Sequence, residues 1–268
     1  MPELPEVETI ACDLRTAVQG KLFSDVTVHD AFLLRQKERD FVRRLKGQAV
    51  DKISRRGKAL IIGLSSGEFL IVQLMMTGQL IVNARRDSHT RISFVFSDGT
   101  VLLYNDQRRF GQLRVVADLG EVKHFSVLGP EPFSEEFTPG FISEEFQKTS
   151  RPVKNVLLDH TFVAGIGNIY ACEILFRARL SPKRQARRIT PQEIKRIHQC
   201  IIEVLKEAIL HRGSSMRNYR DGSGQKGRFN ERLSVYAREG LLCSVCRRPI
   251  ERITQAGRST FYCGHCQK

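Results

Sequence analysis

The first six residues, Met1-Pro2-Glu3-Leu4-Pro5-Glu6, bring together groups that could perform covalent catalysis. A small second residue normally permits removal of the initiator methionine, which would give Pro2 a free secondary amine. An α-amino group has a pKa of about 8, against about 10.4 for lysine, so more of it is unprotonated at neutral pH. Such an amine can attack an aldehydic sugar carbon and form an iminium ion.

Glu3 and Glu6 are three residues apart at the expected start of a helix, so both carboxylates lie on the face beside that amine. Paired carboxylates there could protonate a sugar ring oxygen and move protons during an elimination. Acidic residues also stabilise the positive end of a helix dipole, so helix capping is the alternative role. Residue types alone favour capping.

Four of the seven cysteines form two C-x2-C pairs separated by sixteen residues, namely Cys243, Cys246, Cys263 and Cys266. This spacing is typical of two tight turns that supply four thiolates to one tetrahedral zinc ion. Four protein ligands leave no open coordination position, so the sequence predicts one structural Zn²⁺. The other three cysteines, Cys12, Cys172 and Cys200, lie in apolar helical patterns and are expected to be buried.

The chain is strongly basic, with 43 Lys and Arg against 29 Asp and Glu and a formal charge of +14. A surplus of this size favours a polyanionic partner, because neutralised phosphates release condensed counterions. The charge is concentrated in two stretches: Arg177, Arg179, Lys183, Arg184, Arg187 and Arg188, and then Arg217, Arg220, Lys226 and Arg228. A solvated basic face is the alternative. No apolar run reaches the length of a membrane helix and no signal-peptide pattern is present, so we expect a cytoplasmic protein without membrane contact.

The elements that must position these residues fall into an α+β, multidomain pattern. Residues 5–18 predict a helix with one apolar face, stopped by Gly20. Short β-branched runs follow at Ala59–Leu64, Phe69–Leu74, Gln79–Val82, Ile92–Phe96, Val101–Tyr104 and Gln112–Val116. Asp98-Gly99 is a hairpin signal between two of them. Residues 1–116 therefore predict a catalytic β-sandwich or barrel capped by the N-terminal helix.

The second half of the chain predicts helices and a metal hairpin. Residues 117–150 are acidic and broken by prolines, as in an interdomain connection. Residues 151–234 predict a helical domain with helices at Val153–His160, at Ile169–Arg179, and after a Thr190–Glu193 capping box, ending near Gly213. Within that domain, residues 214–228 predict a mobile loop, and residues 235–268 predict the zinc hairpin.

Five blocks in chain order resemble the formamidopyrimidine-DNA glycosylase and endonuclease VIII family. Pro2–Thr9 resembles its N-terminal signature, Arg55–Lys58 its lysine segment, and Asn105–Gly111 its DNA-intercalating loop. Gly165–Tyr170 resembles its helix–two-turns–helix motif, and Arg258–Cys263 its zinc-finger hairpin. The resemblance covers essentially the whole chain and reverses the preference for simple capping at Glu3.

The resemblance implies a role for each matching residue. Pro2 would be the nucleophile, Glu3 the main general acid with Glu6 assisting, and Lys58 and Arg258 would complete the catalytic set by holding DNA phosphates. Asn168 and Lys154 would also bind DNA. Met76, Arg108 and Phe110 would fill the space left by an everted base, since a glycosylase must take its target out of the stack. Ordinary sandwich core is the alternative for Met76 and Phe110.

One stretch departs from the family pattern. Where the family usually reads His-Leu-Gly-Met-Ser-Gly, this chain reads Gln73-Leu74-Met75-Met76-Thr77-Gly78. Gln73 cannot titrate near neutral pH, and Met75 adds bulk beside Met76, one of the residues expected to fill the space left by an everted base. These two changes bear on substrate preference and not on the class of reaction.

The sequence therefore predicts a base-excision repair enzyme, a DNA glycosylase and abasic-site lyase acting as a monomer on double-stranded DNA. The match at Met76, Arg108 and Phe110 favours oxidised purines, 8-oxoguanine and formamidopyrimidines, as substrates. The alternatives are an endonuclease VIII-like enzyme for oxidised pyrimidines and a lesion-binding protein that does not cut. A zinc-ribbon protein of the ribosome or transcription machinery would leave the N-terminus and the Arg-Arg-Phe loop unexplained.

Overall fold

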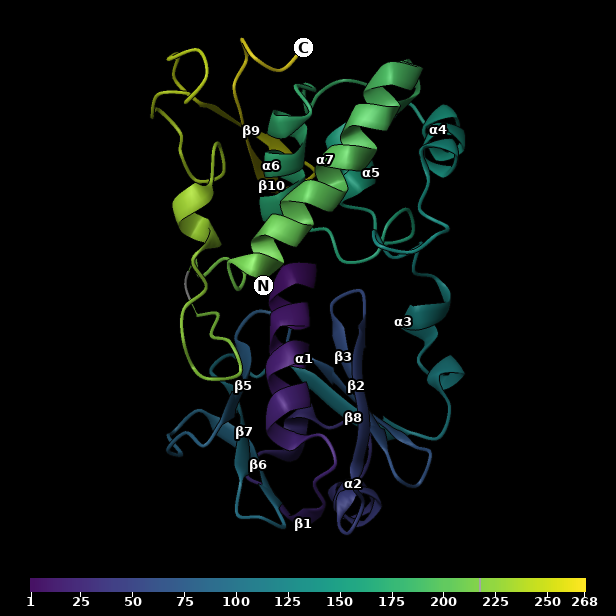
Figure 1. Ribbon diagram of the computed structural model, residues 1–268, viewed down its shortest axis with the longest axis vertical. Coiled ribbons are helices and arrows are strands. Elements are labelled where there is room, and N and C mark those ends of the chain that lie inside the picture. Colours follow the sequence, from purple (N-terminus) through teal and green to yellow (C-terminus); the bar gives the residue numbers. More distant parts are fainter. Residues whose placement is uncertain (217) are drawn as a thin grey trace. The chain divides into compact units, whose positions relative to one another are not determined.

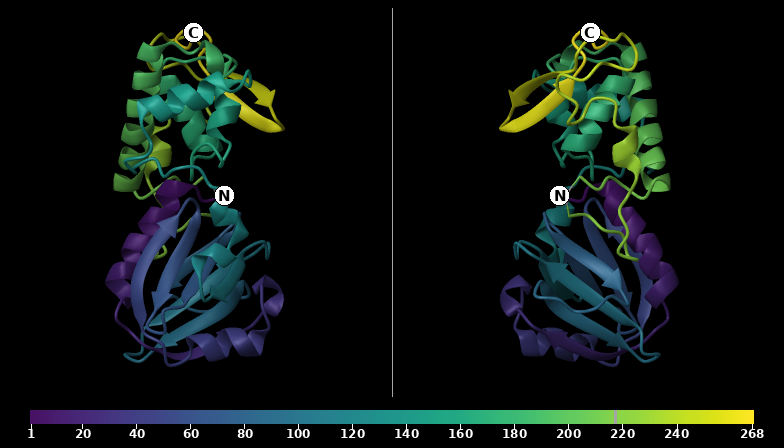
Figure 2. Two further views of the ribbon diagram at one scale, coloured as in Figure 1. Left: turned by 90° about the vertical axis from the view of Figure 1, so that its right-hand side faces the viewer. Right: turned by 90° about the vertical axis from the view of Figure 1, so that its left-hand side faces the viewer.

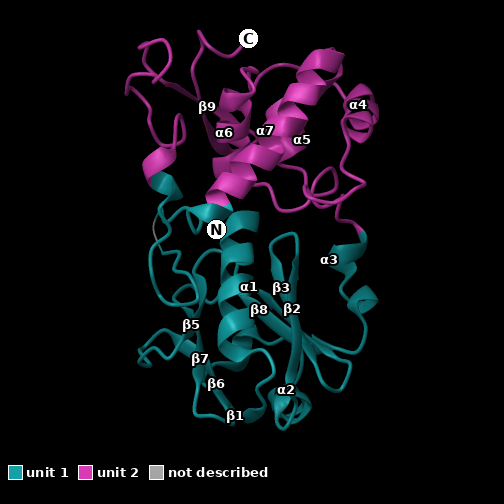
Figure 3. Cartoon of the chain, in the orientation of Figure 1, with its two compact units in different colours: residues 1–126, 209–230 teal, residues 127–208, 231–268 magenta. Residues whose placement is uncertain are grey.

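The computed structural model describes residues 1–216 and 218–268, so Arg217 of the second basic stretch lies outside the described residues. The chain folds into two compact units (Figure 3). Unit 1 comprises Met1–Ser126 and Ile209–Asn230, and unit 2 comprises Val127–Ala208 and Glu231–Lys268. These units follow packing, whereas the four ranges given above follow motifs, so the motif boundaries stay a prediction.

Unit 1 contains two four-stranded antiparallel sheets (Figure 1). One has the order β1-β6-β7-β5, with strands Phe23–Val28, Thr90–Phe96, Val101–Asp106 and Gly78–Val82. The other has the order β2-β3-β4-β8, with strands Val50–Arg56, Ala59–Leu64, Phe69–Gln73 and Gln112–Val116. One apolar core joins side chains from both sheets and from α1 (Leu4–Val18). The predicted sandwich with its helix is confirmed.

The burial pattern explains which strands could be recognised. Along β6 every second residue is buried, and β3 is buried throughout because the turn η2 (Leu119–Glu121) and α3 (Lys123–Ser126) cover its outer side. The two strands that sequence reasoning missed, β1 and β2, bury only every third residue. The missed helix α2 (Glu38–Leu45) buries only Phe41 and Leu45.

The segment after α7 (Pro191–Leu210), predicted to be a mobile loop, packs onto unit 1 at several points. Tyr219 enters the sandwich core, and the Gly222 carbonyl accepts a hydrogen bond of 2.8 Å from the Val82 N–H. The Asp13 carboxylate accepts from the Gly222 N–H at 2.8 Å and from Arg212 at 2.6 Å. These contacts join Tyr219 and Gly222 to the sandwich core, β5 and α1, and the mobility of residues 214–228 stays a prediction.

Unit 2 is built from helices and one hairpin. Its helices include α4 (Pro139–Gln147), α5 (Val153–Leu157), α6 (Asn168–Arg177) and most of α7, and its strands are β9 (Glu251–Gln255) and β10 (Arg258–Tyr262). The predicted capping box is present, because Glu193 accepts from the Thr190 N–H at 2.8 Å while Thr190 accepts from the Glu193 N–H at 3.4 Å. Helix α4 lies in the stretch that was expected to be only a connection. Short 3-10 turns complete the chain at η1 (Ala31–Leu33), η3 (Ala186–Arg188) and η4 (Phe229–Arg232).

Two of the three cysteines outside the C-x2-C pairs are buried as predicted, namely Cys172 and Cys200. The prediction is wrong for Cys12, which is exposed. Its neighbour Ala11 occupies the packed face of α1, so Cys12 turns outward and its sulfur contacts Glu8 and Arg15. Across the described residues, every helix is too short or too polar to traverse a bilayer.

Candidate active site and nucleic-acid interface

The start of α1 holds Pro2 and Glu3 in a buried position. Glu3 is the N-cap residue, and its N–H donates to Glu6 Oε2 at 2.7 Å while its carboxylate receives the Glu6 N–H. Pro2 is buried, and Glu3 is only 4% exposed. The capping role is therefore present in this structure. The same contacts fix the Glu3 backbone directly beside the residue that would carry the amine.

Glu6 ties the start of α1 to the segment that follows α7. Its Oε1 accepts a hydrogen bond of 2.7 Å from the Ser214 N–H. A Cβ at Gly213 would lie 2.8 Å from that same oxygen, and the Gly213 φ is +77°, so only glycine fits there without strain. Because both Glu6 oxygens accept backbone N–H groups, the geometry favours a positioning role for Glu6. Its assistance in proton transfer stays a prediction.

Lys58 is half-buried in the tight turn between β2 and β3, where Gly57 has a φ of +55°. Two contacts hold α1 against β2: Arg55 Nε lies 2.8 Å from Glu8 Oε2, and Arg15 Nε donates to the Ile53 carbonyl at 2.8 Å. Figure 1 shows this turn and the start of α1 at the same end of unit 1. Pro2, Glu3 and Lys58 thus belong to one end of the sandwich.

Met76, Arg108 and Phe110, which we call the wedge, form one cluster on unit 1. The Arg108 guanidinium lies 3.3 Å from the Met76 sulfur and 4.6 Å from the centre of the Phe110 ring. The side chains of Met76 and Phe110 are 44% and 46% exposed, so neither belongs to the sandwich core. The structure thus brings together two apolar side chains and a cation on the surface. Side chains that fill the space left by an everted base need this combination.

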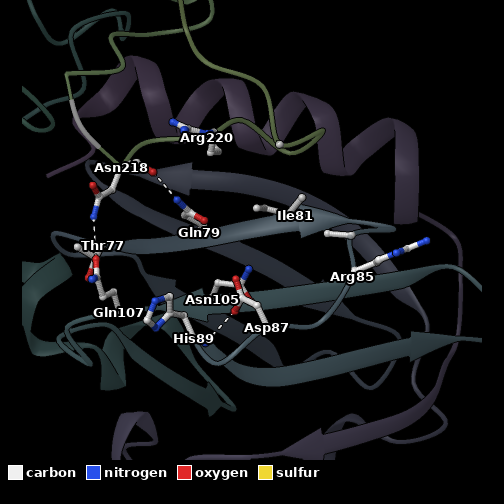
Figure 4. A pocket seen from close by; sticks show the side chains of 12 residues that line it. Thr77, Gln79, Ile81, Arg85, Asp87, His89, Asn105, Gln107, Asn218 and Arg220 are labelled. Carbon is white, nitrogen blue, oxygen red and sulfur yellow. Dashed lines mark hydrogen bonds between the residues drawn. The ribbon is translucent and has the colours of Figure 1, made fainter.

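A polar cavity of ≈ 440 Å³ lies between β5, β7 and the segment after α7 (Figure 4). Gln79 donates to the Asn218 carbonyl, and Asn218 Nδ2 donates to Gln107 Oε1 at 3.4 Å. The lining also includes Thr77, Arg85, His89 and Arg220. Sequence reasoning missed Arg85 and His89, because they lie in the β5–β6 connection without a recognisable spacing.

In unit 2 a buried lysine joins the helices to the zinc hairpin. The Lys154 ammonium donates to Asn168 Oδ1 at 2.6 Å, to Thr260 Oγ1 at 2.7 Å and to the Ser259 carbonyl at 3.3 Å. Asn168, the first residue of α6, also donates to the Ser259 carbonyl, at 2.9 Å. Lys154 is 0% exposed, so this geometry supports a role in orienting Asn168, and the DNA contact expected from the sequence stays a prediction.

Arg258 is exposed at the start of β10, next to the tight turn of the hairpin. Ala256 and Gly257 both have positive φ, at 46° and 71°, and Arg258 pairs with Gln255 across the turn. Figure 2 shows β9 and β10 as a two-stranded ribbon at the C-terminal end of the colour scale. The place of Arg258 beside this turn leaves its guanidinium accessible to a large ligand.

The four predicted zinc ligands come together. The sulfurs of Cys243, Cys246, Cys263 and Cys266 all lie within 4.8 Å of one another, and two pairs are 3.9 and 3.4 Å apart. A tetrahedral site with Zn–S bonds of about 2.3 Å needs sulfurs about 3.8 Å apart, so the cluster fits zinc. The Arg248 backbone N–H lowers the pKa of Cys246 to about 7, whereas burial raises that of Cys266 to about 12. A bound dication would favour the thiolate form of both.

Each unit therefore gathers its own part of the predicted set. Unit 1 holds Pro2, Glu3, Glu6, Lys58 and the wedge, and unit 2 holds Asn168, Lys154, Arg258 and the four cysteines. The structure also adds residues that spacing alone did not suggest, among them the buried Asp106, whose carboxylate accepts from the Gly111 N–H beside the wedge.

Three family models match the chain in order. Residues 1–113 match the formamidopyrimidine-DNA glycosylase N-terminal domain, residues 128–220 its H2TH domain, and residues 240–268 a zinc finger found in FPG and IleRS. A formamidopyrimidine-DNA glycosylase of Desulforamulus reducens is 40% identical, covering 100% of this chain and 99% of the relative.

Solved structures of the same family match as well. The MutM (FPG) protein from Thermus thermophilus is 41% identical and superposes with a TM-score of 0.90, over 99% of this chain and 98% of that one. A Lactococcus lactis FPG mutant in complex with a Fapy-dG-containing DNA is 33% identical, with a TM-score of 0.93 and complete coverage of both chains.

The three family models match in chain order, and the four-cysteine site lies in the last of them. Together they define a zinc-containing DNA glycosylase. The chain belongs to the formamidopyrimidine-DNA glycosylase family. Its zinc is a single structural ion held by Cys243, Cys246, Cys263 and Cys266.

Proposed function

We propose that the chain excises oxidised purines from duplex DNA and then cleaves the strand at the resulting abasic site. The observation that carries this proposal is the buried Glu3 carboxyl group, which caps α1 at the residue next to Pro2. Relatives give further support, since family members have been solved with DNA containing Fapy-dG, carbocyclic 8-oxo-G or an abasic site.

In the proposed reaction the Pro2 amine attacks C1′ of the damaged nucleotide. The bond from C1′ to the base breaks, the base leaves with a proton, and Glu3 protonates the sugar ring oxygen as the ring opens. The product is a cationic iminium that links the protein to the sugar. Loss of a C2′ proton then expels the 3′ phosphate, a second elimination expels the 5′ phosphate, and water releases the amine.

The remaining site residues would hold the DNA in place. Lys58, Asn168 and Arg258 would bind phosphates, with Asn168 oriented by Lys154, since charge-assisted hydrogen bonds to phosphate are strong. Bound zinc would keep the hairpin that carries Arg258 folded. The wedge would enter the stack while the polar cavity beside it receives the everted base, with residues 214–228 as its cover.

The finer expectations on assembly and location belong to the same proposal. A protein that inserts one wedge at one lesion needs only one copy, so we propose that it acts as a monomer. Its substrate is chromosomal DNA, so we propose that it works in the cytoplasm at the nucleoid, without a membrane partner.

Borohydride trapping tests this function directly. The substrate is a duplex with one 8-oxoguanine opposite cytosine, and an undamaged duplex is the control. We expect a covalent protein–DNA band with the lesion only. Pro2→Gly should give a much weaker band, because the secondary amine of proline forms a permanently cationic iminium, whereas the imine of a primary glycine amine is cationic only when it is protonated. Pro2→Gly should still retard the lesion duplex in a gel.

Other outcomes would point to other functions. A band with an oxidised pyrimidine and none with 8-oxoguanine would indicate an endonuclease VIII-like specificity. Lesion-selective retardation without a band on any lesion or on an abasic site would indicate a binding protein that does not cut. A band of full strength from Pro2→Gly would contradict the assignment of the nucleophile.

A further inference from the structure

We propose that the buried carboxylate of Asp106 is the positioning residue that holds the wedge in its inserting shape before DNA arrives, an inference that rests on the proposed function. Asp106 is the last residue of β7 and is 0% exposed. It is neither part of the wedge nor of the residues assigned to the reaction. Its role would be exerted entirely through the two segments that carry Met76, Arg108 and Phe110.

The contacts of Asp106 join those two segments. Its Oδ1 accepts from the Thr77 hydroxyl and from the Arg108 N–H at 3.2 Å, and its Oδ2 accepts from the Gly111 N–H at 2.8 Å. The Thr77 hydroxyl oxygen in turn accepts from the Arg108 N–H at 3.0 Å. Thr77 follows Met76 and Gly111 follows Phe110, so each wedge residue is itself bonded to this carboxylate or adjoins a residue that is.

The same segments carry backbone strain that something must balance. Met75 has a φ of 52° and Arg109 a φ of 58°, both in the left-handed region that disfavours residues with a Cβ. Each strained residue adjoins a member of the wedge. Strained backbone persists only where the surroundings hold it, and such positions gather at functional sites. The hydrogen bonds to Asp106 provide that hold on both segments.

The backbone at Gly78 and Gly111 packs closely against Tyr104, near Asp106. A Cβ at Gly111 would lie 1.7 Å from the Tyr104 hydroxyl oxygen, and one at Gly78 would lie 2.6 Å from it. Burial, and then the charge of Asp106, raise the pKa of Tyr104 well above its usual value, so the phenol stays neutral. A buried carboxylate is tolerated when hydrogen bonds satisfy it, as they do here.

A preformed wedge would matter at the moment when the damaged base leaves the stack. Ordering two loops during that step would add their conformational entropy to the cost of unstacking, whereas a wedge that is already ordered avoids this cost. The inference therefore predicts an effect on base eversion and none on the chemistry at the sugar.

Asp106→Asn tests this distinction, because the amide places an N–H₂ group against the N–H donors of Arg108 or Gly111. We expect excision from an 8-oxoguanine·cytosine duplex to slow about tenfold or more. A single-stranded oligonucleotide with a preformed abasic site has no base stack to open. The rate of its cleavage by Asp106→Asn should therefore stay within about twofold of the wild-type rate. Stopped-flow fluorescence of 2-aminopurine beside the lesion should show the loss in the unstacking step.

Thr77→Val provides a second variant if Asp106→Asn does not fold, and Thr90→Val is its matched control. Because Thr77 also lines the polar cavity, these two variants are compared on the same abasic site in a duplex and in a single strand, neither of which brings a base to the cavity. Both threonines are buried in unit 1, but the Thr90 hydroxyl accepts a hydrogen bond from the Asp87 N–H in the β5–β6 connection. Only Thr77→Val should slow the reaction on the duplex while leaving the reaction on the single strand unchanged. Equal losses on both substrates, or no loss on the duplex, would overturn the inference. If the wild-type protein did not excise 8-oxoguanine, the proposed function itself would fail, which is a different result.

Discussion

At the scale of single residues, Met75 occupies a position whose backbone conformation favours glycine. The family usually has glycine where this chain has Met75, and the structure gives that residue a φ of 52°. A left-handed conformation costs a residue with a Cβ about 1–2 kcal/mol. Met75 is 36% exposed, so its side chain recovers little of that cost through burial.

We therefore predict a reversal of the usual order of alanine and glycine at this position. Elsewhere glycine is less stable than alanine by about 0.5–1 kcal/mol because of its greater freedom in the unfolded chain. At position 75 relief of strain should outweigh that term, so Met75→Gly should exceed Met75→Ala in free energy of unfolding by about 0.5–1 kcal/mol. Urea unfolding of the two variants measures this difference. A more stable Met75→Ala would mean that the backbone there is not left-handed in solution.

Residue roles could be predicted from sequence only where the partners are close in the chain. Pro2 and Glu3 are adjacent, and the cysteines form C-x2-C pairs, so spacing was sufficient to group them. The position of Lys154 was not predictable in this way. Its acceptors include Thr260, more than a hundred residues away, and only the fold shows that its ammonium is buried.

At the scale of elements, the β9–β10 hairpin presents Arg258 to solvent beside its tight turn. We expect Arg258→Ala to weaken binding to damaged and undamaged duplexes alike, because a phosphate contact carries no sequence or lesion information. Losing one phosphate contact should reduce the slope of log K against log salt by about one. Titrations of a labelled duplex at several salt concentrations measure this slope.

Arg252→Ala is the matched control in the same hairpin. Arg252 lies on β9, where its guanidinium is 3.3 Å from Glu239 and 5.9 Å from the Phe261 ring centre. Because its charge already has a carboxylate partner, its removal should change the salt slope less. Equal changes for the two variants would mean that the hairpin contributes only general positive charge.

Long helices and strictly alternating strands were predictable, whereas short helices and strands with irregular burial were not. Helix α1 shows one apolar face, and β6 alternates strictly, so both were recognised. Strand β1 buries only every third residue, and the short helix α2 buries only two side chains, so tertiary packing decided both. Helix α4 has only nine residues and lies in an acidic stretch marked by prolines, so it too was missed.

At the scale of the whole molecule, each unit has an apolar core of its own. The core of the sandwich is made only of unit 1 residues, including Tyr219 from the segment after α7. A separate cluster in unit 2 contains the zinc ligands Cys243 and Cys263 together with Cys172 of α6 and Phe261 of β10. The zinc site is thus part of the packing between the hairpin and the helices.

Removal of zinc should therefore unfold one part of the protein and leave the other intact. Structural zinc contributes about 10–16 kcal/mol of binding free energy, which is more than a small hairpin can replace by packing. We expect a chelator to abolish duplex binding and to remove hydrogen-exchange protection from β9 and β10, while β3 and β4 keep theirs. Added Zn²⁺ should restore duplex binding and the protection of β9 and β10. If β3 lost protection together with β10, the two cores would be one cooperative fold, and if β10 stayed protected, zinc would not be what holds the hairpin.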